Sequence, residues 1–210
     1  MSEDKIVITI GRQYGSGGHE VGEVIAKKLG IKFYDVELFR KAAEDLGSDP
    51  DKLKRFEERR TNTMSVWGDG DVSFMSMPRK LDLISNDDVL FARESELIEE
   101  AAKESCVIVG HCANEVLTNA KIPAAAKVFV YAPVQARIER VMEDYKIPSL
   151  EKADKAVEKM DKTRRSYYQY FTEKRWGGRE GYDLMVDSSI LGIEKTADLI
   201  ISFTKKRLGQ

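Results

Sequence analysis

The chain has few of the residues that build a disulfide framework, a zinc site or a membrane span. Among its 210 residues there are only two cysteines and two histidines. Cys106 and Cys112 fit neither a zinc-ligand spacing nor a disulfide framework. No apolar run approaches the ~18 residues that a membrane-spanning helix needs, and the first ten residues, MSEDKIVITI, lack the pattern of a signal peptide. We therefore expect a soluble protein in a reducing, cytoplasmic setting.

An excess of charge of one sign is also missing. The 34 Lys and Arg residues are balanced by 36 Asp and Glu residues, which leaves a formal net charge of −2. Such a balance gives no global attraction for a nucleic-acid polymer or for a membrane surface, so we expect neither as a partner. Hydrophobic residues make up 42% of the sequence, which is enough for a core. The length suits one domain, or a core domain with a small insertion.

Strand-like and helix-like segments alternate along the chain. Short apolar or β-branched runs predict strands at residues 6–10, 32–34, 106–110, 128–132 and 182–186. Helical patterns lead up to Gly30 and cover residues 38–46, 49–60, 87–103, 133–141, 149–172 and 193–207. Residues 61–80 have no clear period and predict a loop. This order predicts a doubly wound parallel sheet with right-handed crossovers, in which ligands bind beyond the carboxyl ends of the strands.

A glycine-rich segment, GRQYGSGGHEVG at residues 11–22, directly follows the first predicted strand and opens the first helix. Gly15, Gly17 and Gly18 would let the backbone wrap closely around a ligand. The N–H groups of the loop and of the helix start would then form a nest for an anion, and phosphate is its natural occupant. The alternative is a glycine turn needed only for strand–helix packing. The position after the first strand favours phosphate.

This segment departs from the P-loop pattern G-x-x-x-x-G-K-[ST]. Gly18 stands where the lysine should be, and His19 stands at the hydroxyl position. Arg12 is the nearest cation that could replace the lysine, and its forked guanidinium suits phosphate oxygens.

Five segments, in their order and spacing, resemble the cytidylate kinase-like family, a branch of the P-loop nucleoside monophosphate kinases. They are ITIGRQYGSGGHEVG, LGIKFYDVELFRKAAE, CVIVGHCANEVL, DKTRRSYYQYFTEKRWG and YDLMVDSSILGIEKTADLI. The resemblance implies a three-layer α/β P-loop fold over residues 1–210, with a central parallel sheet and helices on both faces. It also implies a helical acceptor-binding insertion at about 45–95 and a lid at about 149–180. ATP with Mg²⁺ would be the phosphoryl donor, and a nucleoside monophosphate such as CMP the acceptor.

On the donor side, the resemblance implies that ATP is bound by the glycine-rich loop and the start of the first helix. The implied residues are Gly11, Arg12, Gly15, Ser16, Gly17, Gly18, His19 and Glu20. Residues 187–189 resemble the family's loop near the donor adenine, although Asp187 could equally cap the closing helix. The magnesium ligands stay open, because Ser16 is misplaced for that role and waters held by Asp35 are an alternative.

On the acceptor side, Asp35 follows the second predicted strand and faces the same edge as the phosphate loop. A carboxylate there can hold the acceptor or orient its nucleophilic oxygen; a helix N-cap is the alternative. Arg40 resembles the family arginine that meets the acceptor phosphate, and a solvated helix charge is its alternative. His111 stands where the family commonly has an arginine, and Glu94 where it more often has a glutamine. Taken alone, His111 would be a hydrogen-bonded structural histidine.

Cations gather in residues 161–179. Phosphoryl transfer needs positive charge that closes over the transferring group, and Lys162, Arg164 and Arg165 are predicted to supply it. A helical arm hinged at residues 177–178 would act as the lid. The alternative is a charged helix that only faces solvent.

We thus expect an ATP-dependent phosphotransferase that moves the γ-phosphoryl group to a small phosphate acceptor such as CMP. A dephospho-coenzyme A-like or other small hydroxyl acceptor is a second possibility, and it would need Asp35 as a base. A nucleotide-binding regulatory module without catalysis is a third, suggested by the absent lysine and by His111. The sequence specifies neither the acceptor nor the oligomeric state.

Overall fold

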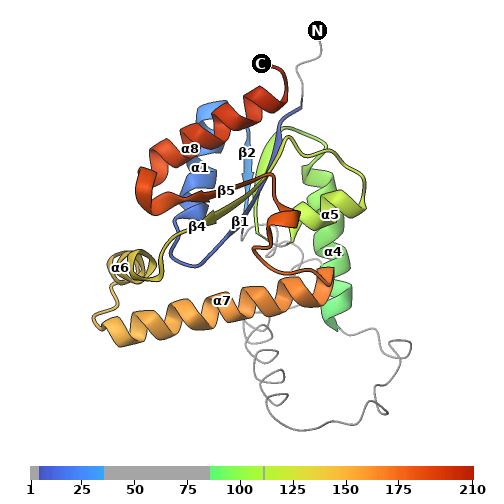
Figure 1. The fold of residues 1–210 in the computed structure, drawn as a ribbon. Helices are drawn as coiled ribbons and strands as arrows, with labels where there is room; N and C mark the ends of the chain where they lie inside the picture. Colours follow the sequence, from blue (N-terminus) through green and yellow to red (C-terminus); the bar gives the residue numbers. More distant parts are fainter. Residues whose placement is uncertain (1–4, 36–85, 111) are drawn as a thin grey trace.

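A single parallel sheet forms the centre of the molecule. The computed structural model describes residues 5–35, 86–110 and 112–210. The strands of this part are β1 (Val7–Arg12), β2 (Lys32–Tyr34), β3 (Cys106–Val109), β4 (Ala126–Tyr131) and β5 (Leu184–Asp187). Their order across the sheet is β2-β3-β1-β4-β5, and every neighbouring pair is parallel. The predicted doubly wound parallel sheet is confirmed (Figure 1).

Helices cover both faces of this sheet and its carboxyl edge. They are α1 (Gly18–Leu29), α4 (Asn86–Ala101), α5 (Ala113–Asn119), α6 (Val134–Asp144), α7 (Leu150–Thr172) and α8 (Ser188–Arg207), with a short 3₁₀ turn, η2 (Arg179–Gly181). Helices α1 and α8 lie on one face, α4 and α5 on the other, and α7 runs below the carboxyl ends of the strands (Figure 1). This is the predicted three-layer arrangement.

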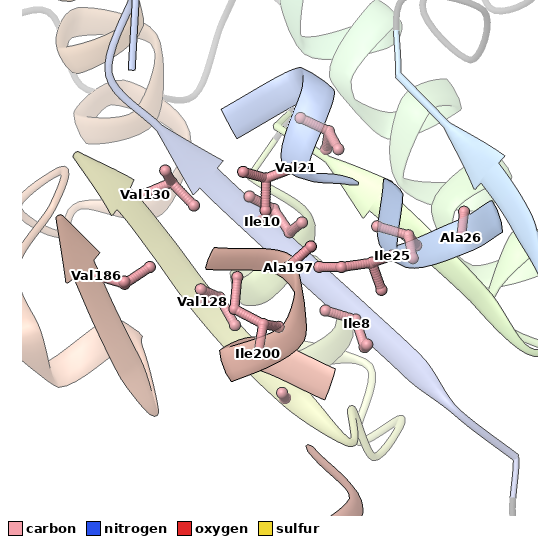
Figure 2. Close-up of a cluster of buried hydrophobic side chains, with 13 residues drawn as sticks. Ile8, Ile10, Val21, Ile25, Ala26, Val128, Val130, Val186, Ala197 and Ile200 are labelled. Atoms are coloured by element: carbon pink, nitrogen blue, oxygen red, sulfur yellow. The ribbon is translucent and has the colours of Figure 1, made fainter. Parts of the chain in front are cut away.

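Successive side chains of β1 point to opposite faces of the sheet, which explains why the core has two layers. Ile8 and Ile10 point to the face that α1 and α8 cover, whereas Val7 points to the face that α4 and α5 cover. Figure 2 shows Ile25 of α1 and Ile200 of α8 meeting these strand residues in one cluster. Burying one such side chain contributes roughly 1.5–3 kcal/mol. The strand that leads into the glycine-rich loop is therefore held from both sides.

Several boundaries differ from those predicted. Strand β1 continues through Arg12, which pairs with Val130 of β4. Helix α8 begins five residues earlier than expected, because Asp187 caps it by accepting a hydrogen bond of 2.9 Å from the Ser189 amide. The cap that the sequence offered as one alternative for Asp187 is thus present. Gly192, with φ 71° and ψ 174°, interrupts the helix and explains why the apolar period became visible only from residue 193.

Helix α5 was not predicted; a turn was expected after the third strand. It has only seven residues, and it starts after Cys112, whose φ of 55° is left-handed and whose side chain makes no cap. A short helix without a capping residue leaves little trace in a sequence. Arg40, His111, the helices at 38–46 and 49–60 and the loop at 61–80 lie outside the described residues. The acceptor-binding insertion at 45–95 therefore stays a prediction.

A buried polar network fixes the end of α7 against α5. Asn114 Nδ2 donates to Tyr168 Oη at 2.8 Å and to the Gly181 carbonyl at 3.2 Å. Tyr168 Oη in turn donates to Glu115 Oε1 at 3.1 Å, and Lys174 Nζ meets Glu115 Oε2 at 2.5 Å. Because buried polar groups are costly unless they are hydrogen-bonded, this network fixes the position of the end of α7 relative to α5.

Candidate active site

The glycine-rich loop connects β1 to α1 through two glycines in the left-handed region of the backbone map. Gly15 and Gly17 have φ of 73° and 74°, a region that side chains disfavour. Gly17 precedes the first turn of α1, where no side chain makes a capping hydrogen bond. The first N–H groups of a helix have no partner within the helix, and the helix dipole adds positive potential. The loop therefore has the backbone geometry of a phosphate site.

Buried contacts hold this loop in place. The Ser16 hydroxyl donates to the Gln13 carbonyl at 2.8 Å, and the Ser188 hydroxyl donates to the Ser16 carbonyl. The Gln13 amide donates to the Val130 carbonyl at 3.1 Å, and Gln13 Oε1 accepts from the Ala132 amide at 3.2 Å. Ser16, a predicted ATP-binding residue, thus holds the loop together through its side chain.

An ion pair between α6 and α7 supports the same loop. Arg137 Nη1 lies 2.6 Å from Asp161 Oδ2, and both side chains are 9% exposed. Asp161 Oδ1 accepts from the Tyr14 amide at 2.8 Å, while Arg137 Nη1 donates to the Tyr14 carbonyl at 3.2 Å. Sequence reasoning missed this pair, because each residue has the appearance of an ordinary surface charge on a polar helix.

Arg12 and His19 converge on Asp35. Arg12 Nη2 lies 3.0 Å from Asp35 Oδ1, and His19 Nδ1 lies 2.5 Å from Asp35 Oδ2. The Asp35 side chain is only 4% exposed. Its hydrogen bond raises the pKa of His19, against an opposing effect of burial, and the charges of Asp35 and Glu23 add to the rise. The structure thus brings two predicted ATP-binding residues together with a predicted acceptor-binding residue.

The Arg12 guanidinium lies toward β2 and β3, the side on which Asp35 stands. A Cβ built on Gly110, at the end of β3, would come within 1.6 Å of Arg12 Nη1, so only glycine leaves room for this side chain. Arg12 was predicted to replace the P-loop lysine, and that role stays a prediction. Its side chain runs past Gly18 at the start of α1 and ends between Gly110 and Asp35.

Of the three cations predicted on α7, Arg164 reaches the loop. Arg164 Nη1 donates to the Arg12 carbonyl at 3.2 Å, and its guanidinium lies 5.6 Å from the centre of the Tyr14 ring. Lys162 and Arg165 are exposed on other faces of the helix. Helical phase separates them, since neighbouring residues on a helix point about 100° apart.

Two further glutamates that the sequence singled out differ in exposure. Glu20 is exposed in the first turn of α1. Glu94 on α4 is 1% exposed and accepts a hydrogen bond from Tyr167 Oη of α7. This bond joins α4, whose first part falls within the predicted insertion at about 45–95, to the helix that carries Arg164.

The side chains present do not fit the magnesium site of a P-loop. The pattern requires a Ser or Thr hydroxyl at the position of His19, and Mg²⁺ prefers oxygen ligands to imidazole nitrogen. Both oxygens of Asp35 already contact cations. Across residues 5–35, 86–110 and 112–210, no group of three or more His, Cys, Asp or Glu residues is placed to hold a metal ion.

Comparison with known sequences identifies the family. A sequence profile described as "Cytidylate kinase-like family" matches residues 7–190, most of the chain. The chain belongs to the cytidylate kinase-like family. Members of this group of P-loop small-molecule kinases typically use ATP with Mg²⁺, and nucleotides are the implied substrates. No curated protein matches this cytidylate kinase-like chain at a significant level.

Solved structures of similar fold cover nearly the whole molecule. An uncharacterized protein from Eubacterium ventriosum is 26% identical with a TM-score of 0.70, over 96% of this chain and 99% of that one. Shikimate kinase from Bacteroides thetaiotaomicron is 12% identical with a TM-score of 0.55, over 95% and 98%. Shikimate kinase from Acinetobacter baumannii, in complex with shikimate, is 16% identical with a TM-score of 0.52, over 97% and 95%. The two kinases establish the P-loop kinase fold. None of the helices in the described part of this cytidylate kinase-like chain is long and apolar enough to span a membrane.

Proposed function

We propose that the chain is an ATP-dependent phosphotransferase of the nucleoside monophosphate kinase type, which transfers the γ-phosphoryl group of ATP to a small phosphate acceptor such as CMP. The observation that carries this proposal is the contact between Arg164 Nη1 and the Arg12 carbonyl at 3.2 Å. It brings a cation from α7 to a loop built for phosphate. Phosphoryl transfer depends on such positioned charge more than on covalent chemistry.

Each part of the site has a role in this reaction. The loop at residues 11–18 holds the phosphates of ATP through backbone N–H groups. Arg164 stabilises the negative charge that develops on the transferring group, and α7 limits access of water to the edge where the reaction occurs. Arg12 contacts the ATP phosphates in place of the P-loop lysine, and Asp35 orients the acceptor. A phosphate acceptor is already ionised near pH 7, so the transfer needs no general base.

A second candidate is a kinase that acts on a hydroxyl group, such as that of dephospho-coenzyme A. The contact of 2.5 Å between His19 Nδ1 and Asp35 Oδ2 favours it, because a carboxylate next to an imidazole can accept a proton. The acceptor oxygen would attack the γ-phosphorus, the bond to the β-phosphate oxygen would break, and the hydroxyl proton would pass to Asp35.

An assay of ADP release across a panel of acceptors tests the proposal. The panel comprises CMP, dCMP, UMP and AMP as phosphate acceptors, and dephospho-coenzyme A and shikimate as hydroxyl acceptors. We expect turnover with a pyrimidine nucleoside monophosphate. Turnover only with a hydroxyl acceptor supports the second candidate, and ATP binding without any turnover supports a regulatory module. Failure to bind ATP at millimolar concentration contradicts all of these functions.

Substitutions on α7 test the role of Arg164. We expect Arg164→Ala to lower kcat/KM by about 10²–10³-fold, the usual effect of removing one group that stabilises transition-state charge. Arg165→Ala removes the same charge from an exposed position one residue away and is expected to change kcat/KM by about threefold or less. Lys155→Gln, an exposed change near the other end of α7, is the control for loss of surface charge. Equal losses in Arg164→Ala and Arg165→Ala would contradict the assignment.

A further inference from the structure

We propose that Arg12 and His19 supply, at the phosphate loop, the positive charge that a loop-held Mg²⁺ supplies in the standard P-loop pattern, so that nucleotide phosphates bind to this loop without metal. The inference rests on the proposed ATP site, and it concerns how that site is charged. It begins from the disagreement between the side chains present and the magnesium site that the family implies.

The position of Arg12 excludes the usual lysine. A Cβ built on Gly18, which occupies the lysine position, would lie 2.5 Å from Arg12 Cβ and 3.1 Å from its Cγ. A lysine at position 18 and the Arg12 side chain as it lies here are therefore incompatible. Gly18 and Gly110 leave the space through which the guanidinium passes, so the chain replaces one cation with another from the preceding strand.

Arg12 also has an unused polar atom. Its Nε is buried and has no hydrogen-bond partner among the residues that the structure describes. A buried donor without a partner is costly, and an ion that binds nearby is one explanation for its presence. The side chain is 14% exposed, so it is not fully closed off from solvent. Phosphate oxygens are the ligand that this forked donor suits best.

His19 adds the second charge. It stands at the hydroxyl position of the pattern and contacts Asp35 on the oxygen that Arg12 does not use. With His19 protonated, the three side chains carry a net charge of about +1; with His19 neutral, they carry about zero. A dication placed at Asp35 would face both cations at short range and be repelled by them.

The charge of this cluster depends on pH through His19. The charged groups that face the imidazole or lie beside its partners come from β1, the end of β2, α1 and α7: Arg12, Asp35, Glu20, Glu23 and Arg164. The carboxylates on this list favour the imidazolium, and Asp35 is the nearest of them. Phosphate binding to the loop is therefore expected to be tighter at about pH 6 than at about pH 8.

Calorimetric titration of the full chain with ATP tests the inference. Titrations are made with excess Mg²⁺ or with EDTA, each at about pH 6 and about pH 8. We expect removal of Mg²⁺ to change the Kd for ATP by about threefold or less, which is under 1 kcal/mol. A loss of affinity of about tenfold or more in EDTA at both pH values would overturn it. No binding under any condition would instead contradict the proposed ATP site itself.

Variants at position 19 separate the effect of the imidazole from titration of the nucleotide. His19→Ser restores the hydroxyl of the pattern, and we expect it to make ATP binding dependent on Mg²⁺ by about tenfold. His19→Asn removes the titrating group, and the pH dependence that remains belongs to ATP. Lys155→Gln is the matched surface control, and circular dichroism checks that each variant is folded. If His19→Ser and the wild type respond identically to EDTA, the inference is wrong; His19→Asn gives the same comparison if the serine variant does not fold.

Discussion

A single buried carboxylate joins Arg12 and His19 at the carboxyl edge of the sheet. Asp35 binds Arg12 through one oxygen and His19 through the other, so three residues from β1, α1 and the end of β2 share one site. Removing the carboxylate would leave the Arg12 guanidinium beside an uncharged neighbour. Because Arg12 is only 14% exposed, removal of the carboxylate would lower the unfolding free energy as well as the affinity for a ligand.

The contact between His19 and Asp35 predicts a dependence of stability on pH. Since the pKa of His19 is raised above its unfolded value of 6.5, protonation stabilises the folded state. This contribution is present in full below the unfolded pKa and is lost as the pH rises through the folded pKa. We expect the difference in unfolding free energy between the wild type and His19→Gln to shrink from about pH 6 upward. Urea denaturation at several pH values measures it, and a difference that is independent of pH would contradict the assignment.

At the scale of elements, α6 and α7 are joined to the phosphate loop through one ion pair. Arg137 of α6 and Asp161 of α7 also bind the carbonyl and the amide of Tyr14, respectively. The two helices also share a small apolar cluster around Val141 and Val157. The pair therefore fixes the middle of α7, near Arg164, against the loop, while the buried network around Tyr168 fixes the end of the helix.

Removal of one member of this pair should destabilise the protein strongly. Asp161→Ala leaves the buried Arg137 guanidinium without its counter-charge and the Tyr14 amide without its acceptor, and we expect a loss of about 3–5 kcal/mol in unfolding free energy. The double variant Arg137→Met with Asp161→Leu removes both charges, and it should recover a large part of that loss. Urea denaturation of the three proteins tests this expectation. A loss below about 1 kcal/mol in Asp161→Ala would show that water reaches the pair.

The elements themselves followed closely from the sequence where local signals were strong. The strand at residues 32–34 was predicted with its observed bounds. Gly30, which was expected to stop the first helix, directly follows the last residue of α1 and has a left-handed φ of 64°. Helix α5 was missed because it has no capping side chain. Local patterns predict an element when its ends and its period are both encoded in neighbouring residues.

The candidate site was only partly predictable. The glycine-rich loop between a strand and a helix is local in sequence, so its glycines and its position after a strand were sufficient to predict its place in the fold; its binding of phosphate stays a prediction. The run of cations on α7 does not indicate whether Arg164 or Arg165 points toward the loop. That choice depends on how α7 packs against the loop, which is a tertiary contact. The pair of Arg137 and Asp161, 24 residues apart, depends on tertiary contact and left no pattern.

At the scale of the whole molecule, the sheet is stabilised by two separate layers of apolar side chains. One joins α1 and α8 to the sheet, and the other joins α4 and α5 to its opposite face. The similarity to solved P-loop kinases covers 95% or more of the chain. The described part of the chain therefore shares the fold of these kinases, while the chemistry of positions 12, 18 and 19 is where this protein departs from the P-loop pattern.

Truncation of a core side chain should show how much the apolar layer between the sheet and helices α1 and α8 contributes to the unfolding free energy. Ile200 on α8 is fully buried against the sheet, and we expect Ile200→Ala to lower the unfolding free energy by about 2–5 kcal/mol. Leu199, the adjacent residue, is 41% exposed, and Leu199→Ala is expected to cost about 1 kcal/mol or less. Thermal and urea denaturation of the two variants measure the difference. Similar losses of unfolding free energy at both positions would mean that α8 packs on the sheet through a different face.

The central place of β1 has a consequence for how the chain folds. Its neighbours in the sheet are β3 and β4, and the contacts that fix its two ends join residues 99 and 119 positions apart. At a synthesis rate of ~5–20 residues per second, β3 and β4 are synthesised on the order of 10 s after β1. During that time β1, which leads into the glycine-rich loop, has no strand to pair with. Non-local pairing of this kind also slows refolding. We therefore expect the nucleotide site to be among the last parts of a newly made chain to form.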